Sequence, residues 1–157
     1  MLDSLLIPFR SQNQPPALPQ GYALDGRGSV QADELNALLV ACGEPERPLA
    51  RLEAALARSA WQLCLRDGGG QLVGFARVTS DLALNANIWD LTAHPAAAER
   101  DQLLLVLVHA VLQRLRRELP GCSISLSAPP EALQALQQHG FVVDPGGIRA
   151  MGLQLLG

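Results

Sequence analysis

The chain has 157 residues, of which 48% are apolar and only 4% aromatic, and its formal net charge is −3 at pH 7. This length fits one domain, whose core Leu, Ala and Val must fill because aromatic side chains are few. The longest apolar run, Leu103 to Val108, is too short to span a bilayer, and the first residues lack the features of an export signal. We therefore expect a cytoplasmic protein without a membrane partner.

The cysteines and basic residues give no sign of a metal or nucleic-acid site. Cys42, Cys64 and Cys122 form no CxxC pair and no Cys–His spacing that suits zinc, so we expect reduced thiols. Every basic residue is Arg. Three of these lie in residues 114–117, near the end of a predicted helix, where they complement the helix dipole. Because no aromatic residues alternate with them, they are a poor nucleic-acid footprint.

The N-terminal third contains a leader, a short strand and two helices. Residues 1–20 are expected to be a flexible leader, since residues 11–20 are rich in Pro and Gln and have no apolar period. Residues 21–24 are a candidate first strand. A helix is predicted over 32–42, where apolar residues recur at i, i+3, i+4 and i+7, and Pro48 opens a second helix at its first position.

The rest of the chain alternates between strand and helix patterns. The sequence predicts, in chain order, strands over 61–66, 72–79 and 88–93, a helix over about 98–119, a strand over 122–127, a short helix ending at Gln138, and strands over 141–143 and 151–155. Gly74, inside the second of these strands, marks a bulge or a close backbone neighbour. The predicted order is β-α-α-β-β-β-α-β-α-β-β, an α+β domain over residues 21–157.

Both this element order and several local sequences match one family. They are Gly74-Phe75-Ala76-Arg77, Asn87-Ile88-Trp89-Asp90, His94-Pro95, His139-Gly140-Phe141 and Asp144-Pro145-x-Gly147-Ile148. From about Gly21 to its C-terminus, the chain resembles the GNAT acetyltransferases of the plastid and cyanobacterial group, which includes chloroplast serotonin N-acetyltransferases. The resemblance implies one domain with a mixed, mostly antiparallel sheet, splayed between the strand at Leu91 and the strand at Cys122.

The resemblance also implies where a donor would lie. In such proteins acetyl-CoA occupies the wedge between the splayed strands, and its pantetheine arm pairs with the backbone of the first strand, here Leu91, Thr92 and Ala93. Its pyrophosphate sits on the N-terminus of the following helix, where free amide N–H groups and the helix dipole attract an anion. The residues expected to meet the pyrophosphate are Arg100, Gln102, Leu103 and Leu104.

This phosphate site departs from the family pattern, Gln/Arg-x-x-Gly-x-Gly/Ala. Allowing one inserted residue, the pattern falls on residues 99–104. Gln102 and Leu104 replace both small residues, so we expect their side chains where phosphate oxygens would lie. Glu99 and Asp101 add negative charges that oppose phosphate, and only Arg100 suits it.

A second departure concerns the acid that protonates the leaving CoA thiolate. Many family members place a Tyr on the short helix before the Gly-Phe pair, and the matching residue here is Leu136. The only tyrosine, Tyr22, is expected in the first strand, on the other side of the fold. Water or Cys122 are the remaining proton sources.

Acetyl transfer to an amine also needs a base. Asp90 is the stronger candidate because its strand enters the wedge, and Asp81 is the second. The alternative for both is an ordinary hydrogen-bonding role. His94, at the mouth of the wedge, is either a proton relay or a turn residue.

Three side chains in and just before the predicted strand over 88–93 are a candidate acceptor pocket. Trp89, Asn85 and Asn87 would line such a pocket for an aromatic amine. The alternative is that Trp89 belongs to the core, as strand tryptophans usually do.

Two functions follow from these patterns. The first is an N-acetyltransferase that uses acetyl-CoA to modify a small-molecule or protein amine. The second is a degenerate, non-catalytic member of the family that binds no cofactor. It would bind a protein partner through the open strands of the wedge, or form a homodimer through its apolar helices.

Overall fold

The computed structural model describes residues 14–149 and 151–155. Its elements are β1 (Ala23–Asp25), α1 (Ala32–Ala41), α2 (Leu49–Arg58), β2 (Trp61–Arg66), β3 (Leu72–Ser80), β4 (Asn85–Ala93), α3 (Arg100–Glu118), β5 (Ser123–Ser125), the 3₁₀ turn η1 (Pro130–Ala132), α4 (Leu133–Gln138) and the 3₁₀ turn η2 (Pro145–Gly147). The strands form one sheet in the order β1-β2-β3-β4-β5. The first four are antiparallel, and β5 is parallel to β4.

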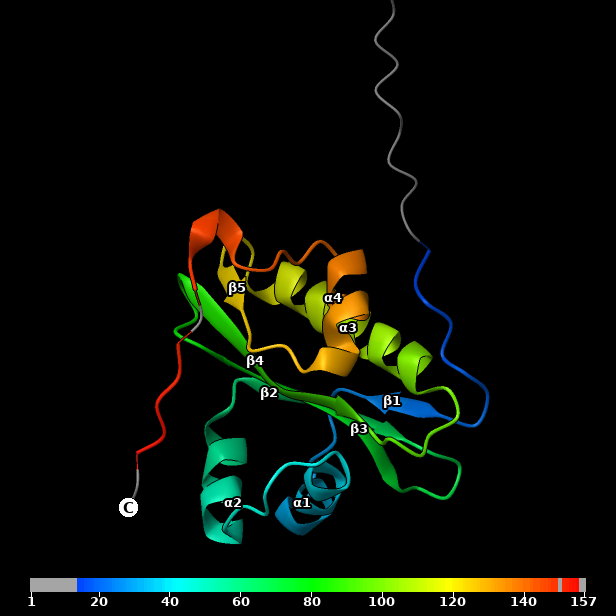
Figure 1. The fold of residues 1–157 in the computed structure, drawn as a ribbon. Coiled ribbons are helices and arrows are strands. Elements are labelled where there is room, and N and C mark those ends of the chain that lie inside the picture. Colours follow the sequence, from blue (N-terminus) through cyan, green and yellow to red (C-terminus); the bar gives the residue numbers. More distant parts are fainter. Residues whose placement is uncertain (1–13, 150, 156–157) are drawn as a thin grey trace, which may run out of the picture.

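Helices cover both faces of this sheet (Figure 1): α1 and α2 lie on one face, and α3 and α4 on the other. The strands therefore carry apolar side chains toward both faces, as in the nearly continuous burial of β3. On the α1 side, Leu35 and Leu39 pack with Phe75 of β3 in one buried cluster.

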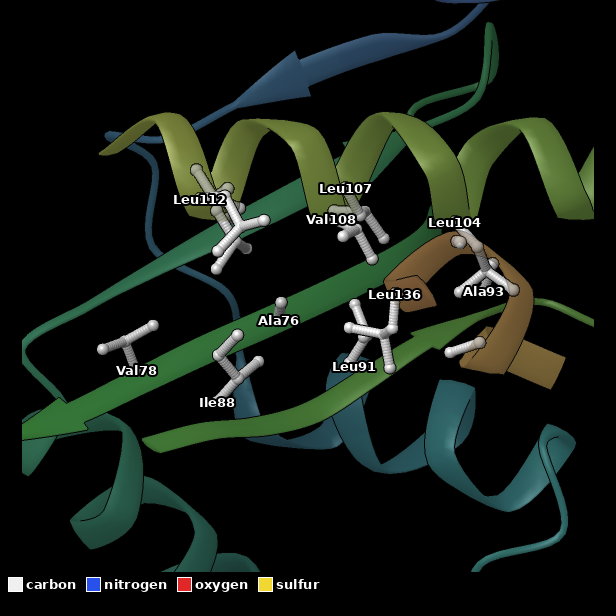
Figure 2. Close-up of a cluster of buried hydrophobic side chains, with 14 of the residues drawn as sticks. Ala76, Val78, Ile88, Leu91, Ala93, Leu104, Leu107, Val108, Leu112 and Leu136 are labelled. Atoms are coloured by element: carbon white, nitrogen blue, oxygen red, sulfur yellow. The ribbon is translucent and has the colours of Figure 1, made fainter. Parts of the chain in front are cut away.

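The larger core cluster lies between α3 and the sheet. Leu104, Leu107, Val108 and Leu112 point from α3 toward β3 and β4, as Figure 2 shows. Gly74 lets α3 approach, because a Cβ there would lie 3.0 Å from Leu65 Cβ and 3.1 Å from Leu107 Cδ1. Of the two alternatives predicted for Gly74, the structure shows the bulge, because the register of β3 against β2 shifts between Leu65 and Arg66, and the close neighbours are side chains.

Strands β4 and β5 part after a short pairing. Only residues 85–87 of β4 pair with residues 123–125 of β5, although β4 continues to Ala93. The register of β4 against β3 also shifts between Phe75 and Arg77, and Asp90 has a φ of 55°. This combination is a β-bulge, which bends β4 away from its parallel neighbour.

The predicted α+β class and the mixed, mostly antiparallel sheet are confirmed, and most elements differ from prediction by one to three residues at their ends. Pro48 was predicted as the first residue of the second helix, but it is the N-cap, and α2 begins at Leu49. The two closing strands are wrong: residues 141–143 and 151–155 form no strand. Both segments have strand-like sequences, but a strand needs a hydrogen-bonded neighbour, and in the described chain β5 pairs with β4 alone.

None of the helices in the described part of the chain is both long and apolar enough to cross a membrane. The leader is described only from residue 14 onward, where Ala17 O accepts a hydrogen bond from Gln102 Nε2. The flexibility expected for residues 1–13 concerns residues outside the described ranges.

Candidate donor and acceptor site

A cavity of about 630 Å³ lies where β4 and β5 part. Its walls are residues 87–89 of β4, residues 124–128 from β5 onward, part of α4, and the segment from Phe141 to Arg149. Most of these side chains are apolar, and the polar ones include Asn87 and Ser125. A mainly apolar cavity with a few polar groups is typical of a small-molecule site.

Asp144 is the one carboxylate among the residues that line this cavity. Its φ of 46° is left-handed, a conformation that Asp tolerates better than most residues. Its Oδ2 lies 3.1 Å from Nη1 of Arg149, which also lines the cavity. The signal for this residue in the sequence is the Asp144-Pro145 motif, which is part of the family resemblance.

Asp90 does not line the cavity. Its carboxylate accepts hydrogen bonds from Arg47 Nη1 at 2.9 Å and from Arg77 Nε at 2.6 Å, and its side chain is 6% exposed. Arg47 lies in the α1–α2 loop, and Arg77 is on β3. The carboxylate therefore ties the bulge of β4 to that loop, on the face covered by α1 and α2. This is the ordinary hydrogen-bonding role that was the alternative for Asp90.

Asp81 is also engaged and lies in the β3–β4 turn, outside the cavity. Its Oδ1 accepts hydrogen bonds from the backbone N–H groups of Ala83, Leu84 and Asn85. These bonds hold the pKa of the Asp81 carboxyl far below its usual range. Asp81 thus shapes the turn. Asn85, the first residue of β4, does not line the cavity either.

Trp89 and Asn87 do line the cavity, as expected for an acceptor pocket. The Trp89 side chain is 44% exposed, so it is not a core residue. Its Nε1 donates to Thr79 Oγ1 at 2.8 Å, and the Arg77 guanidinium lies 5.7 Å from the ring centroid. Asn87 Nδ2 donates to Ser125 Oγ at 2.9 Å, across the last paired part of β4 and β5.

The three residues expected to meet a pantetheine arm lie in the part of β4 that continues past the pairing with β5. Leu91 and Ala93 are buried in the α3-side core. Thr92 points to the other face, where its Oγ1 donates to Cys42 Sγ at 2.9 Å. Their side chains are thus occupied, and Ala93 O already accepts hydrogen bonds from Cys42 Sγ and Arg100 Nε. The backbone of Leu91 and Thr92 remains for a ligand.

At the start of α3, Arg100 is held by groups of its own chain. Its Nε donates to Ala93 O at 2.9 Å, and its Nη2 lies 3.0 Å from Glu131 Oε1. Arg100 therefore joins β4, α3 and η1, and it pairs with neither Glu99 nor Asp101. A phosphate would have to displace these contacts.

Leu103 and Leu104 are fully buried in the core. The expectation that the Leu104 side chain crowds a phosphate is therefore wrong: it points toward Ala93 and Leu136 in the interior (Figure 2). Of these two residues only the backbone could meet a ligand. Leu136, at the position of the family tyrosine, is itself 2% exposed.

The N-terminal segment covers the start of α3 instead. Gln102 Nε2 donates to Ala17 O at 2.7 Å, and Tyr22 Oη donates to Glu99 Oε2 at 3.0 Å. The expectation that Tyr22 lies on the other side of the fold is therefore wrong. The hydrogen bond to Glu99 raises the pKa of the Tyr22 hydroxyl. Two acidic residues and a covering segment thus oppose a pyrophosphate at this helix N-terminus.

Known proteins are similar to this chain in sequence and in fold. The chain matches no protein-family model. It is 34% identical over 131 residues to the uncharacterised N-acetyltransferase ycf52 of Pyropia yezoensis, covering 82% of this chain and 74% of the relative. It is 32% identical over 158 residues to the chloroplastic GCN5-related N-acetyltransferase 1 of Arabidopsis thaliana, covering 92% and 78%.

A third relative and a solved structure complete the comparison. The chloroplastic serotonin N-acetyltransferase 2 of Oryza sativa subsp. japonica is 33% identical over 140 residues, covering 84% of this chain and 67% of the relative. A probable acetyltransferase from Staphylococcus aureus has the same fold, with a TM-score of 0.73 at 16% identity, covering 85% of this chain and 99% of the other. The chain therefore belongs to the GCN5-related (GNAT) N-acetyltransferase family.

Proposed function

We propose that the chain transfers an acetyl group from an acetyl thioester to an amine, and that it holds the thioester in the β4–β5 cavity without a pyrophosphate site on α3. The observation that carries this proposal is the cavity itself, open between two parted strands in a family whose reaction is N-acetyl transfer. The donor would be acetyl-CoA or another acetyl pantetheine. A cytoplasmic location, expected from the sequence, belongs to the same proposal.

Asp144 would be the base of this reaction. A neutral amine attacks the thioester carbonyl, the new C–N bond forms as the C–S bond breaks, and the Asp144 carboxylate accepts the proton that the amine loses. Since Leu136 replaces the family tyrosine, water would protonate the departing thiolate. Arg149 keeps the carboxylate of Asp144 in place until an amine competes for it.

The acceptor would be a small amine with an aromatic ring. Trp89 presents an exposed ring to the cavity, and Asn87 and Ser125 supply polar groups beside it. The names of two relatives span both acceptor classes, serotonin in rice and histone in soybean. The mainly apolar walls favour the small molecule over a protein tail.

Calorimetric titration with two donors tests this proposal. Acetyl-CoA and S-acetylpantetheine share the thioester arm, and only acetyl-CoA carries the pyrophosphate. We expect both to bind with similar Kd, and either at a hundred times its Kd should stabilise the fold by about 2.7 kcal/mol. Much tighter binding of acetyl-CoA would contradict the proposal, because it would require a working pyrophosphate site.

A non-catalytic role is the second candidate, and two observations favour it. The predicted base, Asp90, is neutralised by two arginines, and a buried leucine stands in place of the tyrosine acid. In that case the cavity would bind a peptide partner through the free backbone of β4. Absence of binding by either donor, together with no acetylated product in mass spectra of amine mixtures, would favour this role.

A further inference from the structure

The C-terminal part of the described chain exposes an unusual number of large apolar side chains. The exposed fractions are 70% for Val142, 62% for Val143, 72% for Ile148, 96% for Met151, 88% for Leu153 and 84% for Leu155. Monomeric proteins rarely leave such a run in water. Residues 151–155, here called the C-terminal arm, also alternate apolar residues at every second position, as a strand with one buried face does.

A groove that suits such a strand lies beside β5. It has a volume of about 680 Å³ and runs between β5 and the segment from His139 to Pro145, with α3 forming its floor. Its apolar walls include Leu112, Leu115, Ile124 and Phe141. In the described chain β5 pairs with β4 on one side only, so its other edge offers backbone groups to a further strand.

The turn before the arm directs it away from this groove. Gly147 N donates to Asp144 O at 3.0 Å, Ile148 N donates to Pro145 O at 3.3 Å, and Arg149 pairs with Asp144. Beyond this turn the chain descends past the edge of the sheet toward the level of α2, away from β5, which lies beside the turn, and from α3 on the other face (Figure 1). The arm of one molecule therefore runs away from the groove of the same molecule.

We propose that the C-terminal arm of one copy of this chain adds to the free edge of β5 in a second copy, and that the second copy returns its own arm. Such an exchange is self-complementary and closes as a two-fold dimer. It buries Met151, Leu153 and Leu155 over the apolar floor of the groove and pairs the edge of β5. The groove shares Ile124 and Phe141 with the wall of the donor cavity, but the inference does not depend on the proposed reaction.

Light scattering on the full chain gives the first test. We expect a dimer, and the variant Leu153→Asp should be a monomer with unchanged circular dichroism, because this side chain makes no contribution to the core of its own copy. The matched control is Leu82→Asp, which places the same charge on a leucine that is 68% exposed in the β3–β4 turn. This control should remain a dimer. A monomeric wild-type chain would overturn the proposal.

Cross-linking then identifies where the arm binds. Cys122, half-buried at the start of β5, lines the groove. The variant Leu153→Cys, treated with a short bismaleimide, should give a covalent dimer on denaturing gels, and Cys122→Ser should abolish that product. A product linked within one chain would show that the arm folds back onto its own β5, and it would overturn the exchange between copies.

Discussion

The two aspartates of the candidate site, Asp90 and Asp144, differ in what surrounds their carboxylates. Asp90 has a guanidinium on each oxygen and is almost fully buried, whereas Asp144 has one arginine partner and lines a cavity. The Asp90 carboxylate, enclosed by two cations, stabilises the folded protein. The Asp144 carboxylate, at the cavity wall, is available to a substrate. Each of these roles can be tested by an Asn substitution, because both residues have a positive φ that Asn tolerates.

For Asp90→Asn we expect a loss of stability. The substitution leaves Arg47 and Arg77 with a neutral partner inside a mostly buried cluster, and it should lower the free energy of unfolding by about 1–3 kcal/mol. Urea unfolding at pH 7 measures this change. Acetyl transfer by the folded fraction should persist. A stable but inactive Asp90→Asn variant would instead restore Asp90 as the base.

For Asp144→Asn we expect the opposite pattern. If Asp144 accepts the amine proton, removing its charge should lower kcat by about 10²- to 10⁴-fold, the usual effect of losing a general base. The urea midpoint should change little, because the Asp144–Arg149 pair is mostly exposed on the arginine side. Unchanged kcat would exclude Asp144 from the chemistry and leave its part as shaping the turn at Pro145.

At the scale of single elements, the start of α3 combines two acidic side chains with a covering segment. Replacing Leu104 would damage the core, so the informative changes are Glu99→Gln and Asp101→Asn, which remove charge without creating a cavity. Each should strengthen acetyl-CoA binding by about 0.3–1 kcal/mol, since a negative charge at a helix N-terminus competes with phosphate. Binding of S-acetylpantetheine should not change. If both donors bound more tightly by the same amount, the substitutions would not act through the pyrophosphate of acetyl-CoA.

The link between α1 and β2 gives the fold a dependence on pH. Arg66 forms two hydrogen bonds to Glu34, and they hold the pKa of this carboxyl below its ordinary value of 4.5. A carboxyl with a lowered folded pKa stabilises the protein above its unfolded pKa, and this contribution is lost as pH falls through the folded pKa.

We therefore expect Glu34→Gln to lower the free energy of unfolding by about 1 kcal/mol at pH 7. The loss is small because the ion pair is partly exposed and water weakens it. The difference from wild type should shrink when urea unfolding is repeated near pH 3. The exposed Glu53→Gln on the neighbouring α2 serves as control and should show little difference at either pH. A deficit that persists at pH 3 would indicate lost packing and no lost ion pair.

The sequence predicts a helix or strand well where its apolar periodicity is strong. It predicts a strand poorly where the strand depends on which neighbouring strand it pairs with. The strands at 61–66 and 72–79 and the helices at 32–42 and 98–119 have strong apolar periods, and the structure contains all four. Residues 141–143 and 151–155 have the same kind of pattern, but a strand depends on a neighbour that the pattern does not specify. Likewise, the sequence identified Asp90 as a carboxylate near the wedge, but not the two arginines, distant in the chain, that engage it.

At the scale of the whole molecule, two core clusters share one sheet, and the cluster on the α3 side packs tightly against Gly74. There β3 lies against Leu65 of β2 and Leu107 of α3, and a Cβ would come within 3.0–3.1 Å of both side chains. The neighbouring Leu65 Cβ cannot rotate away, because it is fixed to the backbone of a paired strand. The Leu107 side chain, or α3 as a whole, would therefore have to shift outward.

For Gly74→Ala we therefore expect a loss of about 1–3 kcal/mol in the free energy of unfolding, the usual cost of overpacking a filled core. Urea unfolding measures it, with Gly68→Ala as the matched control, because a Cβ at Gly68 meets its nearest atom at an ordinary 3.5 Å. The second variant Gly74→Ala/Leu107→Ala should recover little, since it removes one of the two obstacles and opens a cavity beside it. If Gly74→Ala were neutral, the contact between β3 and α3 would be loose enough to admit a methyl group, and the glycine would reflect only the local bulge in β3.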